Sequence, residues 1–270
     1  MLKLYTANNS ICTQKVLLSL AEKGLPYETR IIDLFSNEQY APWYLAINPK
    51  GVVPALDHGG NIVIESSLIC EYLDEFFPMP RLMPAATHAR ARARLWSKTV
   101  DEGLFEATRE LSFSAMFREK MRMMTEEQRQ GRFLNVGDPV KRARFVSTYA
   151  EGVESVYVYQ GIAEFERAFA RMEKDLGHEG WLVGSRMTLA DINMIPFVAR
   201  LAYLELLDVW VSDRPATRAW WARVQNLASF KTAIAEKLTE GDVAAMRTSG
   251  RKIYARVAER RQEYLDQIAG

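Results

Sequence analysis

Residues 48–56 read Asn-Pro-Lys-Gly-Val-Val-Pro-Ala-Leu, an apolar run with a proline where a central strand would need a backbone N–H. Pro54 therefore marks either an edge strand or a cis peptide bond that turns the N–H and C=O of Val53 outward. Gly59-Gly60 is a strong hairpin signal, and residues 61–64 follow it as a short apolar strand. The stretch thus predicts a proline turn followed by two antiparallel strands.

A helix is expected directly after this hairpin. Residues 68–76 carry apolar side chains at helical spacing, and Glu65-Ser66 precedes them. Ser66 is expected to be the N-cap residue, because serine oxygens accept hydrogen bonds from the first N–H groups of a helix. The N-terminus of such a helix also has a positive dipole end, so it suits a peptide carboxylate.

The residues before the proline turn predict a strand, a helix and a second strand. Residues 2–5 form a short apolar strand, and Asn8-Asn9-Ser10 are turn and N-cap formers. Residues 15–23 place apolar side chains on one helical face, and a glycine and a proline then stop the helix. Residues 27–34 are predicted to be a strand. The complete order of elements is that of a thioredoxin-like domain.

This order, together with four motifs, resembles the glutathione S-transferase superfamily. The motifs are the Ser10 turn, the stretch at 48–56, Glu65-Ser66, and Thr188-Leu-Ala-Asp191, and they span nearly the whole chain. The spacing of Thr188 and Asp191 is that of a capping box, which favours a structural role for the aspartate. The resemblance implies an α/β plus all-α fold class, with an N-terminal thioredoxin-like domain followed by a C-terminal helical-bundle domain.

The composition changes after Pro78 from mixed strands to long helical runs, and Pro80 and Pro84 mark a linker. We therefore expect a thioredoxin-like, glutathione-binding domain at residues 1–80. An all-helical, electrophile-binding domain with a C-terminal helical extension is expected at residues 86–270. Its helices are expected mainly within residues 86–124, 142–177, 189–207 and 215–228, and in a basic helix at the C-terminus.

Length and charge narrow the class of protein. A chain of 270 residues with 48% hydrophobic residues can bury a large core, and its formal charge of +1 gives no reason to expect nucleic acid as a partner. No signal segment and no run of about 18 apolar residues is present, so no membrane partner is expected and a cytoplasmic location is predicted. The basic runs at 90–94 and 251–261 are interpreted as solvated helix faces or intersubunit ion pairs.

The cysteines and histidines predict neither a disulfide scaffold nor a metal site. There are 2 cysteines, and the 3 histidines are scattered without ligand spacing. Cys70 lies within a predicted helix, where packing is its expected role. Cys12 lies near the start of a helix, where a thiolate would be stabilised, so a redox role is the alternative for this residue.

The resemblance implies that glutathione is a cosubstrate and that its thiol must become a thiolate. Free thiols ionise above neutral pH, so the enzyme must favour the charged form. Ser10, at the position of the active serine in theta-like members, would donate a hydrogen bond to the sulfur while the helix dipole adds positive potential. The alternative is that Ser10 only caps its helix. Asn8, Asn9 and Thr13 are the nearby substitutes.

The resemblance also implies a set of glutathione-binding residues. Val53 would pair its backbone with the cysteinyl residue of glutathione, in the geometry that a cis Pro54 creates. Glu65 would accept a hydrogen bond from the γ-glutamyl amine, and Ser66 would bind the γ-glutamyl carboxylate. Lys50 would meet the glycyl carboxylate.

Three further inferences concern the glycyl end and the subunit interface. Gln39 is a weaker candidate for the glycyl end of glutathione. The resemblance implies that Asp101 lies at the subunit interface of a homodimer and helps bind the γ-glutamyl amine of the neighbouring site; a solvated helical carboxylate is the alternative. The basic helix at residues 90–94 would form part of that interface.

The electrophile pocket is expected in the second half of the chain. Residues 111–148 are rich in Met, Phe and Arg, a composition typical either of ordinary helix core with a loop or of an adaptable apolar lid. This segment, with residues 96–102 and 181–183, resembles the bacterial glutathione-dependent β-aryl-etherases. The expected partner is a small hydrophobic electrophile. A noncatalytic glutathione-fold binding protein and a thiol-disulfide reductase acting through Cys12 are the alternatives.

Overall fold

The computed structural model describes residues 1–270, except for the side chain of His178. The chain divides into two compact units, each assembled from three stretches of sequence. The first unit consists of Met1–Ser97, Asp175–Pro196 and Ala219–Thr239, and the second of Lys98–Lys174, Phe197–Arg218 and Glu240–Gly270.

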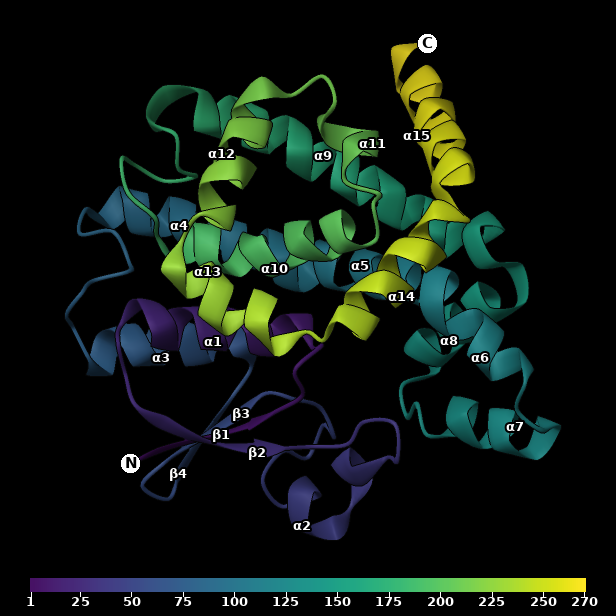
Figure 1. The fold of residues 1–270 in the computed structure, drawn as a ribbon, viewed down its shortest axis with the longest axis horizontal. Helices are drawn as coiled ribbons and strands as arrows, with labels where there is room; N and C mark the ends of the chain where they lie inside the picture. The colour runs from purple at the N-terminus through teal and green to yellow at the C-terminus, as the bar shows by residue number, and fades with distance from the viewer. The chain divides into compact units, whose positions relative to one another are not determined.

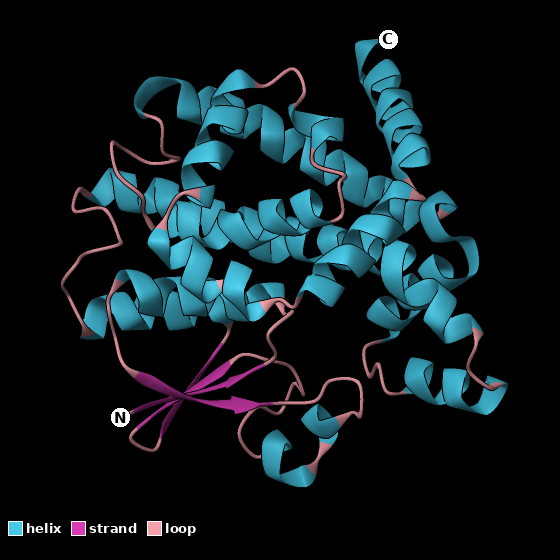
Figure 2. Cartoon of the chain, in the orientation of Figure 1, coloured by secondary structure: helices cyan, strands magenta, loops and turns pink.

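A four-stranded sheet lies in the first unit (Figures 1 and 2). Its strands are β1 (Leu2–Thr6), β2 (Tyr27–Ile31), β3 (Ala55–His58) and β4 (Asn61–Ile64), in the order β2-β1-β3-β4. β1 pairs in parallel with β2 and antiparallel with β3, and β3 pairs antiparallel with β4. This sheet confirms the thioredoxin-like prediction, although β2 ends three residues before the predicted Leu34.

The turn between β3 and β4 forms as its sequence predicts. His58 pairs with Asn61, so the loop consists of Gly59 and Gly60 alone. Their φ angles are 61° and 92°, in the left-handed region that only glycine adopts at little cost. The dipeptide therefore fixes the register of the hairpin.

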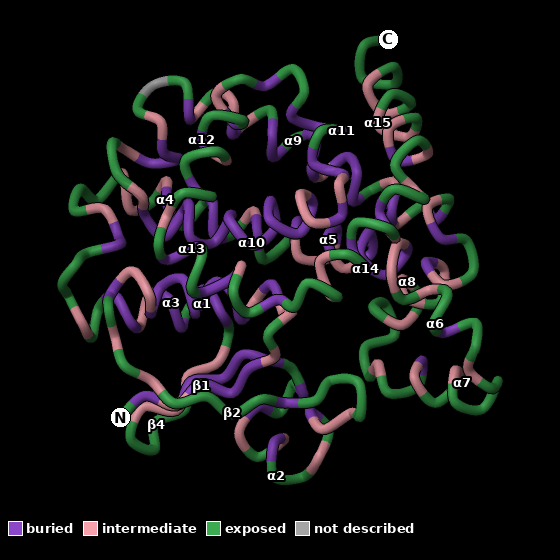
Figure 3. Tube along the Cα trace, in the orientation of Figure 1, coloured by how far each residue is buried: buried purple, intermediate pink, exposed green. Residues whose placement is uncertain are grey.

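Two helices, α1 (Ile11–Glu22) and α3 (Ser66–Phe76), lie side by side over the sheet (Figure 1). Both helices contain buried residues (Figure 3). Val16, Leu20 and Leu73 are among them. On the sheet itself, the paired residues Tyr5 and Ala55 pack with Tyr44 of α2 (Pro42–Leu45). The remaining short helices of this unit are η1 (Glu38–Tyr40), α13 (Ala228–Ala233) and η5 (Ala235–Lys237).

A buried ion pair anchors the predicted linker after α3. Lys23 Nζ donates to Asp74 Oδ1 at 2.7 Å and to the carbonyl oxygens of Phe77 and Pro80 at 2.7 and 2.8 Å. The Asp74 carboxylate also accepts hydrogen bonds from the backbone N–H groups of Leu82 and Met83. The linker is therefore tied to both α1 and α3.

The remaining elements are helical, in agreement with the predicted fold class. They comprise α4 (Thr87–Thr99), η2 (Val100–Leu104), α5 (Phe105–Ser112), η3 (Phe113–Phe117), α6 (Arg118–Arg122), α7 (Glu126–Leu134), α8 (Pro139–Glu151), η4 (Gly152–Glu154), α9 (Val156–Glu179), α10 (Leu189–Tyr203), α11 (Asp208–Val211), α12 (Pro215–Gln225), α14 (Glu240–Arg251) and α15 (Tyr254–Ala269). In the second unit, α14 approaches the end of α10 so closely that a Cβ on Gly250 would lie 1.8 Å from the Leu204 carbonyl oxygen. Among the described residues, no helix is both long and apolar enough to cross a membrane.

The segment rich in Met, Phe and Arg forms a small helical cluster with a core of its own. Phe113, Met121 and Phe133 are buried together, and Phe145 packs edge-on against two of their rings. Met123, in contrast, is 82% exposed. The helix-core interpretation therefore describes Phe113, Met121 and Phe133, but not Met123.

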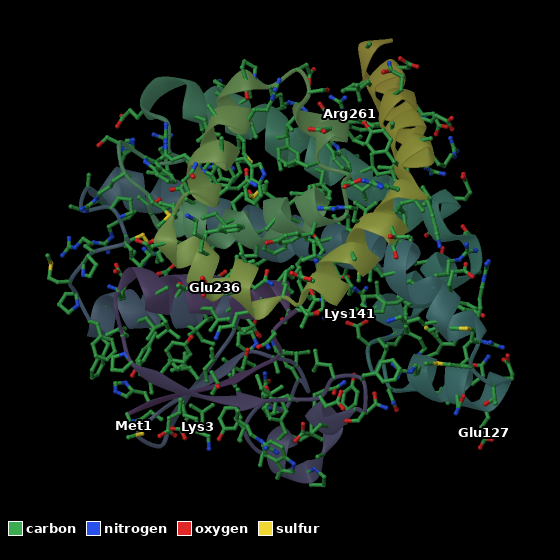
Figure 4. The ribbon with its side chains drawn as sticks, viewed as in Figure 1. Met1, Lys3, Glu127, Lys141, Glu236 and Arg261 are labelled. Carbon is green, nitrogen blue, oxygen red and sulfur yellow. The ribbon has the colours of Figure 1, made fainter. Side chains whose placement is uncertain are left out.

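The basic C-terminal helix α15 is bound to its own chain. Arg260 forms an ion pair with Glu154 at 2.8 Å, and Arg261 (Figure 4) forms one with Glu166 at 2.6 Å. A hydrogen bond from Arg256 is the main cause that lowers the pKa of Glu154 to about 2. The interpretation of this run as a solvated or intersubunit face is therefore wrong for Arg260 and Arg261, because their carboxylate partners lie within the same unit.

A buried carboxyl in α5 gives the fold a pH dependence that can be tested. Glu110 is 2% exposed, and its Oε1 accepts a hydrogen bond from Arg144 Nε at 2.6 Å. Burial raises the pKa of Glu110 from 4.5 to about 7. The native state therefore keeps a proton that the unfolded chain loses at lower pH, so stability falls as pH rises through this window and is constant above it.

We expect Glu110→Gln to lack this dependence. The stability of the variant relative to wild type should rise by on the order of 3 kcal/mol between about pH 4.5 and pH 8, because one pKa unit corresponds to about 1.4 kcal/mol. Urea unfolding of both proteins at several pH values measures the difference. Parallel stability curves for the two proteins would contradict the assignment.

Candidate functional site

Ser10 is the N-cap residue of α1 and is half-buried. Its Oγ accepts from the backbone N–H of Thr13 at 3.3 Å, and its own N–H donates to the Ala7 carbonyl at 2.9 Å. Among the described residues, the Ser10 hydroxyl accepts this hydrogen bond and donates none. Its proton is therefore available for an anion at the positive end of α1, in addition to the capping role.

The substitutes for Ser10 differ in accessibility. Thr13 is fully buried, so its hydroxyl cannot reach a ligand outside the helix. Asn8 is exposed, and its carbonyl accepts from Gln14 Nε2 at 3.3 Å. Cys12 is half-buried in the first turn of α1, whereas Cys70 is fully buried, in agreement with its predicted packing role.

The proline turn is held by two side chains to which the sequence analysis assigned no role. The Tyr44 hydroxyl and Asn48 Nδ2 both donate to the Val52 carbonyl, at 2.8 and 2.7 Å. Asn48 Oδ1 accepts from the backbone N–H of Lys50 at 3.1 Å. Burial raises the pKa of Tyr44 to about 12, so its phenol stays a hydrogen-bond donor at neutral pH.

The peptide bond between Val53 and Pro54 is cis, which confirms one of the two interpretations of Pro54 from the sequence. The edge-strand alternative is wrong, because β3 lies between β1 and β4. Val53 is 8% exposed, and its backbone N–H and C=O form no hydrogen bond with the described residues. These two groups can therefore pair with an extended peptide.

The start of α3 differs by one residue from the prediction. Glu65, not Ser66, is the N-cap residue, with φ 70° and ψ 112° and no capping hydrogen bond from its side chain. The Glu65 carbonyl already accepts the first helical hydrogen bond, from Ile69 N at 2.8 Å, and this makes Ser66 the first helical residue. Ser66 is 7% exposed.

Lys50 and Glu65 are in direct contact. Lys50 Nζ lies 2.6 Å from Glu65 Oε1, and the two side chains are 62% and 48% exposed. An exposed pair of this kind contributes about 0–1 kcal/mol, so a charged ligand can open it at little cost. The pair must open if these residues bind opposite ends of a tripeptide.

The remaining predicted residues divide between the two units. Gln39, in η1, is 8% exposed, and its Oε1 has no hydrogen-bond partner among the described residues. The backbone carbonyl oxygen of Gln39 would lie 3.2 Å from a Cβ added to Gly51, so Gln39 lies beside the proline turn. Asp101 lies in η2, in the second unit, and is exposed.

Two other features of the described residues bear on the site. A cavity of about 250 Å³ in the first unit is lined by charged residues, including Glu71, Glu75, Arg90 and Arg94, and by none of the predicted site residues. No group of three or more His, Cys, Asp and Glu side chains that could hold a metal ion occurs among the described residues.

Known proteins share the two-part sequence pattern of this chain. Residues 9–75 match the glutathione S-transferase N-terminal domain, and residues 115–223 match the C-terminal domain. Protein LigF of Sphingobium sp. strain SYK-6 is 32% identical over 71% of this chain and 75% of its own length. Maleylacetoacetate isomerase of Pseudomonas aeruginosa is 30% identical over 86% of this chain and 93% of its own.

Solved structures show the same relationship. The crystal structure of the β-etherase LigF from the same Sphingobium strain superposes with a TM-score of 0.77, at 29% identity, over 88% of this chain and 99% of the other. The chain belongs to the glutathione S-transferase family. It is therefore an enzyme of a family that uses glutathione as a cosubstrate.

Proposed function

We propose that this protein transfers the thiolate of glutathione to a hydrophobic, aromatic electrophile, with a β-aryl ether as the substrate class. The observation that carries the proposal is the Ser10 hydroxyl, which caps α1 and retains a proton to donate. Similarity to the β-etherase LigF supports the choice of substrate class.

Ser10 has the central role in the proposed reaction. Its hydroxyl donates a hydrogen bond to the glutathione sulfur, and the N-terminus of α1 adds positive potential, so the thiolate is favoured. The sulfur then attacks the carbon that bears the aryloxy group. The thiol proton passes to water when the thiolate forms. A C–S bond forms as the C–O bond breaks, and the aryloxide leaves with the bonding electrons and takes up a proton from water, so that no net proton is released.

The residues around the proline turn would hold glutathione. The unpaired backbone groups of Val53, before cis Pro54, suit antiparallel pairing with the cysteinyl residue. Ser66, in the first turn of α3, suits the γ-glutamyl carboxylate, and Glu65 suits the γ-glutamyl amine. This arrangement supports a glutathione-binding domain at residues 1–80.

The glycyl end and the second domain complete the proposal. Lys50 and Gln39 would bind the glycyl carboxylate, Lys50 after its pair with Glu65 opens. The helical domain at residues 86–270 would supply the electrophile pocket. In a homodimer, Asp101 would contribute to the γ-glutamyl amine site of the other subunit.

Product analysis tests the proposed reaction. The wild-type protein is incubated with glutathione and, separately, a β-aryl ether, a halogenated aromatic, maleylacetoacetate and a mixed disulfide. Ether cleavage should yield equimolar phenol and glutathione thioether, detected by mass spectrometry. Isomerisation would leave glutathione unconsumed and would favour the activity named for the Pseudomonas relative. No turnover on any substrate, despite glutathione binding, would favour a noncatalytic binding protein.

Asn48→Ala is expected to weaken glutathione binding about tenfold without removing a predicted ligand contact. The variant loses one donor to the Val52 carbonyl and the acceptor for Lys50 N, so the proline turn loosens. Titration calorimetry with glutathione measures the effect. Asn61→Ala is the matched control, because that exposed asparagine bonds only within the hairpin. Equal affinities for the two variants would contradict the role of Asn48.

A further inference from the structure

A loop of the first unit leaves the sheet beside the turn that carries Ser10. β1 and β2 pair in parallel along their whole length, and the last pair is Thr6 with Ile31. Both strands therefore end at the same edge of the sheet, where α1 also begins (Figure 1). The Ile32 N–H donates to the Thr6 carbonyl at 2.8 Å, so the two segments stay side by side one residue further. Residues 33–37, called the β2 loop below, follow directly.

The β2 loop is a hydrogen-bonded turn. The Asp33 carboxylate accepts from the backbone N–H groups of Phe35 and Ser36 at 2.9 and 3.2 Å. The Ser36 hydroxyl donates to the Asp33 carbonyl at 3.1 Å. Glu38 closes the loop, because its carboxylate accepts from Asp33 N at 2.8 Å and from Arg30 Nη2 at 2.9 Å. These bonds fix the backbone of the loop without a ligand.

This turn holds two apolar side chains in solvent. Phe35 is 63% exposed and Leu34 is 37% exposed, whereas Ile32, directly before the loop, is 1% exposed. Single exposed apolar residues are common, but this phenylalanine is held by a fixed turn at the sheet edge that carries Ser10. The loop is shaped by the hydrogen bonds of Asp33 and Glu38. The ring of Phe35 therefore presents a flat apolar surface that folding does not require.

We propose that Phe35 is a specificity-determining residue that stacks on an aryl ring of the group bonded to the glutathione sulfur. This inference rests on the proposed glutathione transferase function. It adds a surface of the first unit to the electrophile site, which the sequence analysis placed in the second half of the chain. Aromatic rings in offset or edge-to-face contact attract each other beyond the effect of the area that they bury. Phe35 thus makes the site prefer aryl to alkyl groups on the sulfur.

Two thioethers of glutathione separate this aryl contact from glutathione binding itself. S-Phenacylglutathione carries an aryl ketone on the sulfur, and S-methylglutathione carries a single carbon. Calorimetry with wild type and Phe35→Ala measures both affinities. The substitution is expected to weaken S-phenacylglutathione about three- to tenfold and to change S-methylglutathione by less than about 1.5-fold. An unfolded fraction lowers the active fraction for both ligands equally, so it leaves the affinity ratio unchanged.

Two further variants separate the ring from its apolar bulk. Phe35→Tyr keeps the ring and should keep the wild-type affinity ratio within about twofold. Phe35→Leu keeps apolar bulk without a ring and should lose most of the preference for the phenacyl group.

Phe76 provides a matched control. It is 56% exposed and lies at the end of α3, in the same unit. It is separated from Ser66 by about 15 Å of helix. Phe76→Ala should therefore keep the wild-type ratio of the two affinities.

The outcomes distinguish this inference from the function on which it rests. Wild-type protein that binds neither glutathione nor the thioethers would overturn the proposed function, and the inference with it. A preference for S-phenacylglutathione that is equal in wild type and Phe35→Ala would overturn the inference alone, as would equal binding of both thioethers by wild type. An equal loss of preference in Phe76→Ala would also count against it. If Phe35→Ala does not fold, Phe35→Leu decides.

Discussion

Replacing Ser10 by alanine is expected to lower kcat for glutathione-dependent ether cleavage about 10²- to 10³-fold and to change KM for glutathione by less than about threefold. A hydrogen bond to a charge that the reaction needs typically contributes this much to the rate. The Ser10 hydroxyl holds the thiolate, whereas the proposed binding contacts come from the proline turn and the start of α3. Without the hydroxyl, the pKa of the bound thiol rises and less thiolate is present at neutral pH. Steady-state kinetics at several pH values measures both effects.

Two controls isolate the hydroxyl of Ser10 from its capping role. Loss of an N-cap serine costs about 1 kcal/mol, so thermal unfolding must show that Ser10→Ala remains folded. Ser10→Thr keeps a hydroxyl and a cap and should retain part of the activity. Cys12→Ala should turn over the ether as wild type does. Unchanged kcat in Ser10→Ala would remove Ser10 from the mechanism, and disulfide reduction lost only in Cys12→Ala would favour the reductase alternative.

The parts of this protein that sequence predicts well are those with local causes. The Gly59-Gly60 turn needs positive φ angles, and Ser10 caps α1 because its oxygen reaches an N–H three residues later. Pro54 left two interpretations, and only the position of β3 within the sheet decides between them. The observed helix and strand boundaries differ from the predicted ones by one to three residues, as at Glu65 and at the end of β2, because the conformation of end residues depends on neighbouring packing.

Contacts between distant residues had no signal in the sequence pattern. Lys50 meets Glu65 although resemblance assigned them to opposite ends of glutathione, and Arg256 meets Glu154, 102 residues away. The burial of Lys15, in contrast, could have been predicted from a closer examination of the spacing of apolar residues in α1. This residue lies four residues after Ile11 and three before Leu18, both buried, so it occupies the core face of α1. Lys15 Nζ donates to Ser67 Oγ at 2.6 Å, and this partner could not be predicted, because it depends on how α1 and α3 approach each other.

Asp191→Ala is expected to destabilise the protein by about 3–5 kcal/mol, the largest effect on folding among these variants. The carboxylate is fully buried and accepts four hydrogen bonds: from Thr188 N and Oγ1, from Leu182 N at 3.0 Å, and from Trp220 Nε1 at 3.0 Å. Alanine would leave the N–H donors buried without partners. Urea unfolding followed by tryptophan fluorescence measures the change, and a loss below about 1 kcal/mol would contradict this assignment.

If the four hydrogen bonds cause this effect, Asp191→Asn should be nearly as destabilising as Asp191→Ala. The amide NH₂ of asparagine would face N–H or O–H donors where aspartate has a carboxylate oxygen. Asp213→Asn is the matched surface control and should change stability by less than about 0.5 kcal/mol, since that side chain is 67% exposed. Asp191 joins three segments of the first unit: the residues before α10, the first turn of α10, and Trp220 of α12. Its loss should therefore lower the unfolding midpoint while kcat, measured well below that midpoint, stays near wild type. A fall in kcat without a fall in stability would instead give Asp191 a part in the reaction.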